Sequence, residues 1–344
     1  MEDSFYKIGG SIVSQQTYEQ TTNERYVTCV SVATVWTEPL SARRIDALAL
    51  HNPAHVDQWV KQLDDTEKLA LCVENRIQTQ LLYGEQVLVT EWAGDWAHVI
   101  IPTQPSHKDR RGYPGWVPAC QLKQISNQDW LQPIGAIVRS PFASLTIHNE
   151  SSIHLSYLTI LPVKRHHGST TSVVTPHGIG YVHTQDIELF SKADGIVRSN
   201  GESIVAIAKS YIGLDYLWGG MSAYGYDCSG LAYAAHKANG YQIARDAGDQ
   251  VKGGVKVPLD RILPGDLLFF AYQNGKGRIH HVGIYSGNGD MLHAPQTGKG
   301  IEQISLANTM YETELCAARR YWQEEETIEN GKSNSRSKPS EEIF

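Results

Sequence analysis

The stretch that most constrains this chain is Asp-Cys-Ser-Gly-Leu at 227–231, because it places a cysteine where a helix should begin. Small and apolar residues recur after it at helical spacing, at positions 231, 234, 235 and 238, which predicts a helix starting close to Cys228. Asp227 suits the N-cap, since its carboxylate accepts N–H bonds that the first turn leaves free. The positive end of the helix dipole favours the thiolate, the nucleophilic form of cysteine. The sequence therefore predicts a reactive Cys228 with a depressed pKa.

A β-hairpin is predicted for 280–294, where two alternating stretches flank a turn-forming Ser-Gly-Asn-Gly-Asp run. If the loop holds an odd number of residues centred on Asn288, the His281 and His293 side chains lie on one face of the sheet. A two-residue turn would put them on opposite faces. On one face they supply a base and a polar group to orient it, with Cys228 as the nucleophile. For Cys228 alone, the competing interpretation is a small buried hydrophobic residue.

Composition narrows the class of protein. At 344 residues, with 41% hydrophobic and 19% charged side chains, the chain is predicted to form two or three globular domains. A net charge of −7 without a basic run argues against nucleic acid as a partner. No run of about 18 apolar residues exists, so no membrane helix is expected.

The cysteines and the first residues bear on location. Five cysteines form an odd set at irregular spacing without a C-x-x-C pair, which disfavours disulfides and a zinc knuckle. Residues 1–20 lack an apolar core followed by a small-residue cleavage site, so no secretory signal is predicted. A reducing cytoplasm is the expected location, although a secreted protein trimmed of its signal would look the same. We expect a monomer without a cofactor or a metal.

The order of strand-like and helix-like stretches predicts an α+β chain of two β-rich units followed by a unit of helices and strands. The first β unit, at 24–125, begins with a strand-like run at 27–36 and carries a helical insertion near 42–68. The remaining predicted parts are an N-terminal arm at 1–23, a second β unit at 126–190, a linker at 191–202, an α+β domain at 203–322 and a disordered tail at 323–344. A weak internal echo, 115–122 against 180–187, indicates duplication of the β unit.

Several motifs together resemble the NlpC family of papain-like cell-wall peptidases, over about residues 203–322. They are Ala-Lys-Ser-Tyr-Ile-Gly at 208–213, Tyr-x-Trp-Gly-Gly at 216–220, Asp-Cys-Ser-Gly-Leu at 227–231, Pro-Gly-Asp-Leu at 264–267, His-Val-Gly-Ile-Tyr at 281–285 and His-Ala at 293–294. The two β units resemble bacterial SH3-like barrels, the first more specifically, through Tyr-Gly-Glu at 83–85 and Gly-Trp-Val at 115–117. With two such units in front, the whole chain is similar to the YkfC-type members. The resemblance implies a papain-like domain, with helices packed on an antiparallel sheet, behind two small SH3-like β-barrels, the first of which carries the helical insertion.

That resemblance implies a cysteine peptidase that hydrolyses the γ-D-glutamyl–diamino-acid bond, to L-Lys or meso-diaminopimelate, in murein peptides with a free N-terminal L-Ala. It would release L-Ala-γ-D-Glu during the recycling of bacterial peptidoglycan peptides. By the same resemblance, Cys228 is the nucleophile, His281 the base and His293 the third member, acting as a neutral acceptor. The Tyr216 hydroxyl and the Cys228 backbone N–H are the implied oxyanion donors, with plain packing as the alternative for Tyr216.

The resemblance also implies substrate contacts beside the nucleophile. Asp227 and Ser229 match positions of this kind, with a pure helix cap as the alternative for Asp227. Asp246 matches the carboxylate that receives the substrate's ammonium in YkfC-type members, since a buried ammonium needs a charged partner.

The first barrel is expected to add a glutamate and a tyrosine to the ammonium pocket. We assign these contacts to Glu74 and Tyr113, with Glu85 and Glu91 as rivals for the glutamate and a solvated strand face as the alternative for all of them. A recycling enzyme that meets only short peptides can close one end of its groove. We therefore expect the first barrel to pack over the Cys228 cleft and to block it beyond the L-Ala residue.

Other classes of function remain open from the sequence. One is a wall-lytic endopeptidase whose SH3-like domains bind peptidoglycan, and another is a binding protein with an inactive peptidase fold. A third is an acyltransferase on the same fold. The intact set of Cys228, His281 and His293 favours a working peptidase.

Overall fold

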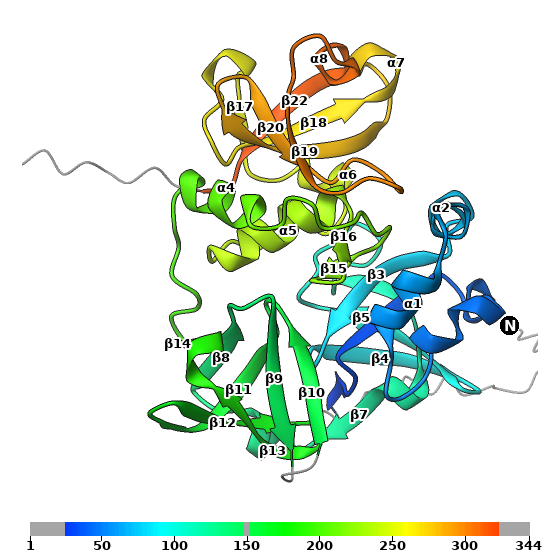
Figure 1. Ribbon diagram of the computed structural model, residues 1–344, viewed down its shortest axis with the longest axis vertical. Coiled ribbons are helices and arrows are strands. Elements are labelled where there is room, and N and C mark those ends of the chain that lie inside the picture. The colour runs from blue at the N-terminus through cyan, green and yellow to red at the C-terminus, as the bar shows by residue number, and fades with distance from the viewer. Residues whose placement is uncertain (1–24, 148–150, 323–344) are drawn as a thin grey trace, which may run out of the picture.

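The computed structural model describes residues 25–147 and 151–322, so the arm at 1–23 and the tail at 323–344 lie outside the described residues. Two seven-stranded sheets and one six-stranded sheet make up most of this part of the chain. The first two sheets lie below a layer of helices and the third lies above it (Figure 1). Within the described ranges, no helix is long and apolar enough to cross a lipid bilayer.

The first barrel has the strand order β3-β2-β6-β5-β4-β1-β7. Its strands are β1 (Arg25–Thr28), β2 (Val32–Trp36), β3 (Ile77–Leu82), β4 (Gln86–Ala93), β5 (Trp96–Ile101), β6 (Tyr113–Pro118) and β7 (Leu122–Ile125). The strand-like run at 27–36 forms two strands, β1 and β2. They belong to different parts of the barrel, because β1 pairs with β4 and β7, whereas β2 pairs with β3 and β6.

The helical insertion of the first barrel connects β2 to β3 and is longer than the expected 42–68. It consists of two 3₁₀ helices, Pro39–Ser41 and Arg44–Ala49, followed by α1 (Val56–Gln62) and α2 (Asp65–Val73). A capping box begins α2. The Asp64 carboxylate accepts from the Glu67 N–H, and the Glu67 carboxylate accepts from the Asp64 N–H. Trp59 on α1 is fully buried and donates to Asp46, which ties the insertion together.

The second barrel repeats the first strand for strand. Its order, β10-β9-β13-β12-β11-β8-β14, is the order of the first barrel with every number raised by seven. The strands are β8 (Ile134–Val138), β9 (Phe142–Ile147), β10 (Ser151–Ser156), β11 (Ile160–His167), β12 (Thr170–Thr175), β13 (Gly178–His183) and β14 (Ile187–Ser191), and α3 (Asn127–Trp130) precedes them. The sequence echo falls on matching parts, a strand, a 3₁₀ turn and a strand in each barrel. Shared topology and this echo together support a duplication.

The third unit packs helices on an antiparallel sheet of order β17-β22-β18-β19-β20-β21. Its strands are β17 (Val255–Val257), β18 (Leu267–Ala271), β19 (Ile279–Gly287), β20 (Asp290–His293), β21 (Glu302–Ser305) and β22 (Leu315–Arg320). The helices are α4 (Gly201–Lys209), α5 (Cys228–Ala238), α6 (Ala247–Gln250), α7 (Tyr272–Gly275) and α8 (Met310–Glu314), with a short β15 (Met221–Ser222) and β16 (Gly225–Tyr226) before α5. Helix α4 starts inside the expected linker, because Asn200 caps it by accepting from the Ser203 N–H.

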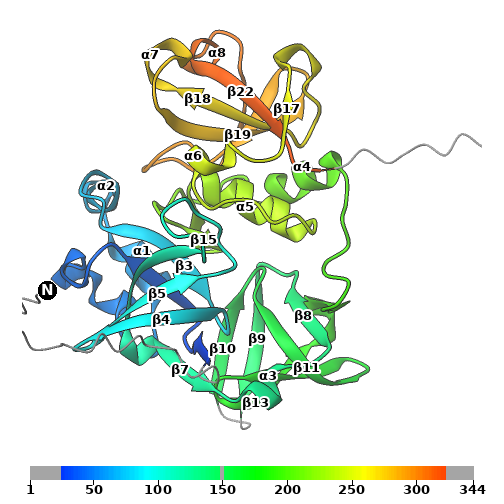
Figure 2. The same ribbon diagram turned by 180° about the vertical axis from the view of Figure 1, so that it is seen from behind.

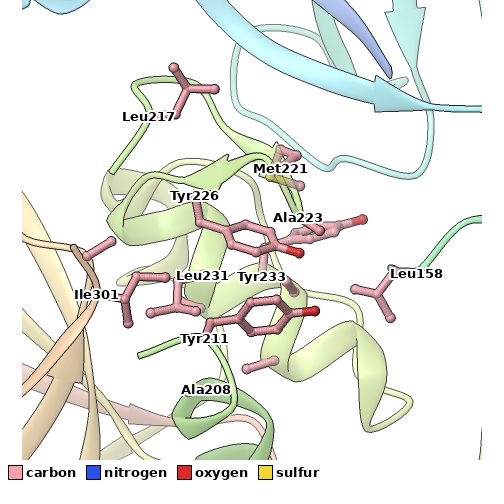
Figure 3. Close-up of a cluster of buried hydrophobic side chains, with 14 of the residues drawn as sticks. Leu158, Ala208, Tyr211, Leu217, Met221, Ala223, Tyr226, Leu231, Tyr233 and Ile301 are labelled. Carbon is pink, nitrogen blue, oxygen red and sulfur yellow. The ribbon is translucent and has the colours of Figure 1, made fainter. Parts of the chain in front are cut away.

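The main core lies around α5, which runs between the third sheet and the two barrels (Figures 1 and 2). Small side chains such as Ala234 and Ala235 are fully buried, so the helix approaches its neighbours closely. Tyr211 and Tyr226 pack edge to face beside it, with ring centroids 5.1 Å apart (Figure 3). The same apolar cluster takes in residues of both barrels, such as Val32 and Ile137. The three units therefore share one continuous core.

Candidate active site

Cys228 is the first residue of α5, as the sequence predicted, and Asp227 is the N-cap. Asp227 has an extended backbone, and its Oδ1 accepts from the Gly230 N–H at 2.6 Å. The backbone N–H groups of Ser229 and Val282 face the Cys228 sulfur. Val282 lies on β19, so this strand passes directly beside the start of the helix.

The Asp227 carboxylate is saturated by internal donors. Its oxygens accept from the Gly219 N–H at 2.9 Å, from the Ser229 hydroxyl at 3.1 Å and from both terminal nitrogens of Arg245 at 2.7 and 3.1 Å. Asp227 is 5% exposed and Arg245 is 1% exposed, so the ion pair is buried. Both side chains point inward and hold Arg245, which gives them a structural role, and the substrate contacts implied for them stay predictions. Sequence reasoning did not identify Arg245 as the partner of the cap.

His281 and His293 lie on one face of the β19–β20 hairpin, as predicted. His281 Nε2 and His293 Nδ1 are 2.8 Å apart, and the two ring planes are nearly perpendicular at 82°. The register, with Ile284 opposite Leu292, is the one expected for a loop centred on residue 288.

The prediction of an odd number of residues in the hairpin loop was wrong. Asn288 and Gly289 form a two-residue turn, both with positive φ, in which Gly287 pairs with Asp290. A register shift between Tyr285 and Gly287 adds one residue to β19. This β-bulge keeps the earlier part of β19, which includes His281, in the predicted register and on the predicted face.

The pKa values of the thiol and of the first imidazole are both shifted toward the neutral forms. Burial raises the pKa of Cys228 to about 12, and the nearby Asp227 charge acts in the same direction. Burial also lowers the pKa of His281 well below its ordinary value, with the neighbouring His293 and His280 adding to the effect. The expectation of a depressed thiol pKa was wrong, because enclosure of the sulfur outweighs the helix dipole, and Asp227 at the cap opposes that dipole.

His293 is held neutral by its surroundings. Burial lowers its pKa to about 4, and Lys299 contributes in the same direction. Its Nδ1 faces His281, while its buried Nε2 lies 3.4 Å from Glu302 Oε1, outside hydrogen-bond geometry. Glu302 sits opposite His293 in the β20–β21 pairing. Sequence reasoning missed Glu302, because no motif marks it and only the strand register brings it to the ring.

Two tyrosines line the space around the sulfur. Tyr216 is buried, and burial followed by the proximity of Cys228 and Asp227 raises its pKa well above 10, so its hydroxyl stays protonated. Tyr311, on α8, contacts the rings of both His281 and His293, with centroids 5.3 and 5.1 Å away. Burial raises the pKa of Tyr311 to about 12, and Cys228 adds to this shift. Tyr311 was not found from the sequence, since α8 carries none of the recognised motifs.

Asp246 and Tyr113 meet, although 133 positions separate them. The Tyr113 hydroxyl donates to both Asp246 oxygens at 3.0 Å, and Lys108 Nζ lies 3.4 Å from the same carboxylate. Burial and the Asp246 charge raise the pKa of Tyr113, so its hydroxyl remains a donor. Gln78 is the third neighbour of Tyr113, and its Oε1 lies 3.3 Å from the Tyr113 hydroxyl. Its side chain is a neutral amide.

The structure does not bring Glu74 to this pocket. Glu74 follows α2 and forms an ion pair with Arg76. The rival Glu85 accepts from the Leu82 N–H and from Thr103, and Glu91 is exposed on β4. Among the described residues, none of these three carboxylates forms a hydrogen bond or ion pair with Asp246 or Tyr113. The assignment of Glu74 followed sequence position alone, whereas the pocket is lined from β3, through Gln78.

The first barrel docks directly on the segments that flank Cys228. From β3, the Ile77 carbonyl accepts from the Trp218 indole N–H at 3.1 Å, and the Thr79 hydroxyl accepts from Arg245 Nε at 2.9 Å. The loop at 102–112 adds the Pro105 carbonyl, which accepts from the Arg245 N–H at 3.0 Å. Gly219 has φ +72, and a Cβ there would lie 2.6 Å from Ile77. Contact between the two units is therefore close enough to require glycine at this position.

A cavity of about 840 Å³ lies away from this centre. It is lined by both barrels and by Tyr224, and none of the predicted site residues borders it. Within the described residues, no three His, Cys, Asp or Glu side chains converge to hold a metal ion. The chemical groups of interest are thus the thiol, the two imidazoles and the Asp246–Tyr113 pair.

A cysteine at a helix start, a histidine pair on the adjoining antiparallel sheet and helices packed on that sheet define a papain-like cysteine peptidase. A family model described as the NlpC/P60 family matches residues 213–320, and one described as the YKFC SH3b2 domain matches residues 138–190. The second barrel resembled SH3-like domains less specifically than the first in its sequence, yet this SH3 family model matches it.

Full-length relatives agree with these matches. The "Gamma-D-glutamyl-L-lysine dipeptidyl-peptidase" of Bacillus subtilis (strain 168) is 46% identical over 295 residues, covering 86% of this chain and 98% of that protein. A protein of the same name from Bacillus cereus (strain ATCC 10987 / NRS 248) is 36% identical over 299 residues, covering 85% and 89%. A crystal structure of a NlpC/P60 family protein from Bacillus cereus ATCC 10987 superimposes with a TM-score of 0.83 at 35% identity, over 87% of this chain and 100% of that one. This chain belongs to the NlpC/P60 family.

Proposed function

We propose that this enzyme hydrolyses the γ-D-glutamyl–diamino-acid bond of murein peptides that carry a free N-terminal L-Ala, and so releases L-Ala-γ-D-Glu. The observation that carries the proposal is the half-buried Asp246 carboxylate, held by Tyr113 of the first barrel next to the Arg245 that binds the cap of the Cys228 helix. A carboxylate at a closed end suits a peptide ammonium. Two relatives that match over most of their length bear the name of this activity.

In the proposed mechanism Cys228 attacks the γ-carbonyl of the D-glutamyl residue. His281 Nε2 is engaged by His293, so Nδ1 is the ring nitrogen left to take the thiol proton. The resulting imidazolium donates its Nε2–H to the neutral His293 Nδ1 and then protonates the leaving amine. Because the pKa shifts favour the neutral thiol and imidazole, His281 has to accept the thiol proton for the attack to occur. Water then hydrolyses the thioester, with His281 as the base.

The proposed oxyanion donors are the Cys228 backbone N–H and the Tyr216 hydroxyl. The N–H belongs to the first turn of α5, where backbone donors lack intrahelical partners. The raised pKa of Tyr216 supports this role, since a protonated phenol donates a hydrogen bond at neutral pH. The phenol also avoids adding a charge beside the sulfur.

A closed end explains why a free N-terminus would be obligatory. Each charge-assisted contact contributes roughly 1.5–3 kcal/mol. An acetylated N-terminus loses the Asp246 contact and leaves that carboxylate facing a neutral group. We expect acetylation to lower kcat/KM at least about a hundredfold, or roughly 2.7 kcal/mol.

The test is to incubate the protein with L-Ala-γ-D-Glu-L-Lys, with its meso-diaminopimelate analogue, with N-acetylated forms of both and with intact murein. Mass spectrometry should detect L-Ala-γ-D-Glu only from the free peptides, and the ratio between the two should reveal the preferred diamino acid. The variant Cys228→Ala should keep the fold and lose turnover by several orders of magnitude. Equal cleavage of acetylated peptide or intact murein would instead support a wall-lytic endopeptidase, and turnover by Cys228→Ala within tenfold of the parent would remove the assignment of the nucleophile.

A further inference from the structure

A lysine of the protein itself occupies the ammonium pocket. Lys108 lies on the loop at 102–112 between β5 and β6, and its Nζ donates to the Tyr113 hydroxyl and to Gln78 Oε1 at 2.6 Å. The same Nζ is 3.4 Å from Asp246 Oδ2 and 4.2 Å from the centroid of the Tyr113 ring. One ammonium group thus contacts the carboxylate, the amide, the hydroxyl and the aromatic face of the pocket.

The charge of the pocket is already balanced by Lys108. Asp246 is the one carboxylate among these contacts, Gln78 is neutral and Tyr113 keeps its proton. The neighbouring Arg245 aims its guanidinium at Asp227 and Thr79. A second ammonium entering while Lys108 stays would give the pocket a net positive charge and meet a like charge at contact distance.

We propose that Lys108 stands in for the α-ammonium of the substrate in the empty enzyme and must leave when the peptide binds. This inference rests on the proposed function, since it assumes that Asp246 receives the peptide N-terminus. Lys108 then competes with the substrate's ammonium for Asp246 and so weakens substrate binding. It also disfavours neutral N-termini, because they have no charge with which to replace its pairing to Asp246.

The loop lets the side chain leave while its backbone stays in place. His107 anchors the loop, since its backbone N–H and its ring both contact Asp249, at 3.0 and 2.7 Å. Pro105 is anchored through the Arg245 N–H. In contrast, about a third of the Lys108 side chain is exposed, as is a third of Asp246, so the ammonium can swing into water.

The experiment compares Lys108→Met with Lys108→Arg and with Arg110→Met, which removes an exposed cation from the same loop. A partly exposed pair competes weakly, so KM for the free tripeptide should fall about threefold to tenfold in Lys108→Met while kcat stays the same. Lys108→Arg should restore the parental KM, because it keeps the competing charge. Arg110→Met should match the parent and so exclude an effect of net charge alone.

Binding to the same set in a Cys228→Ala background, measured by calorimetry with the uncleaved tripeptide, separates affinity from turnover. Tighter binding to the Lys108→Met form supports the proposal. Equal or weaker binding overturns it and leaves the peptidase assignment intact, with weaker binding marking Lys108 as a substrate contact instead. If no member of the set, including Cys228→Ala alone, binds the tripeptide, both the proposed function and the inference fail.

Discussion

The two barrels share one strand order, yet only the first contributes side chains, Tyr113 and Lys108, that contact Asp246 in the described residues. The difference lies in their connections. Between β5 and β6 the first barrel has the loop at 102–112, whereas the matching β12–β13 connection is the two-residue turn at 176–177. The β2–β3 connection of the first barrel carries its helical insertion, at 39–73. The sheet is thus a scaffold, and the loops determine what each copy does.

The contacts with the peptidase unit differ in the same way. The first barrel reaches Trp218, Arg245 and Asp246, which flank the nucleophile or line the pocket. The second barrel bonds farther away, where the Ser156 hydroxyl accepts from the Ala223 N–H and Arg139 donates to the Ala238 carbonyl at the end of α5. The comparison predicts that changes in the first barrel alter catalysis, whereas changes in the second alter stability.

The largest effect is expected for Asp246→Asn. Loss of the carboxylate removes the partner of the substrate's ammonium, so kcat/KM for the free tripeptide should fall about a hundredfold. Tyr181→Phe, on the second barrel at the position that echoes Trp116, changes a side chain that is 47% exposed and should stay within twofold. A strong effect of Tyr181→Phe would contradict the division of labour between the barrels, and no effect of Asp246→Asn would remove Asp246 as the partner of the ammonium.

Acid is expected to destabilise the peptidase unit through a buried histidine. Burial lowers the pKa of His236 on α5 to about 4. The unfolded chain takes up this proton near pH 6.5 and the folded chain only near pH 4, so stability falls as pH falls through that interval. For this residue alone the free energy of unfolding should drop by about 2 kcal/mol between pH 7 and pH 5.

Denaturant unfolding of the parent and of His236→Asn at the two pH values checks this. The asparagine amide can donate to the Ala232 carbonyl, as Asn239 does one turn later to Ala235, so the variant keeps the bond and loses the titrating group. The variant should show the smaller change between the two pH values. If the parent and the variant change equally, the acid sensitivity comes from groups other than His236, in the peptidase unit or in the barrels.

A matched pair of buried hydroxyls tests the two interfaces directly. Thr79→Val leaves Arg245 Nε and Gln104 Oε1 without their Thr79 partner, and Ser156→Ala leaves the Ala223 N–H unpaired. Both should lower stability by a similar 1–3 kcal/mol. Only Thr79→Val should also lower kcat/KM, by about tenfold, because Arg245 holds the Asp227 cap. Equal loss of activity in both variants would mean that the barrels affect the site only through global stability.

The smallest effect is expected for Glu302→Gln. Its carboxylate lies 3.4 Å from His293 Nε2 and favours the tautomer that leaves Nδ1 free to accept from His281. Because Glu302 is 40% exposed, the loss in kcat should be about threefold with KM unchanged. A change in KM alone would show that Glu302 touches substrate instead of orienting the ring.

The sequence predicted what local rules determine. Asp227 and the apolar spacing located the helix start, and strand alternation placed His281 and His293 on one face. The resemblance brought out Asp246 and Tyr113, which do meet. The bulge in β19 escaped prediction, because a bulge and an odd loop give the same register from the same residues.

Other features depend on distant parts of the chain. Glu302, Tyr311 and Lys108 belong to segments without motifs and reach the site only through tertiary packing. The raised pKa of Cys228 depends on the burial of the thiol by the folded chain and on the nearby Asp227 charge. Helix position alone therefore predicted the wrong direction for its pKa.

The buried Arg245 has a consequence for modularity. The Arg245 guanidinium joins the Asp227 cap to Thr79 of the first barrel. The backbone N–H of Arg245 donates to the Pro105 carbonyl of the same barrel. Without the first barrel, the peptidase unit would lose these contacts. The buried Arg245–Asp227 ion pair would then be exposed to water. The first barrel is thus part of the support of the nucleophile and not a detachable accessory. Exchange of barrels between relatives would have to preserve this connection to preserve an enzyme.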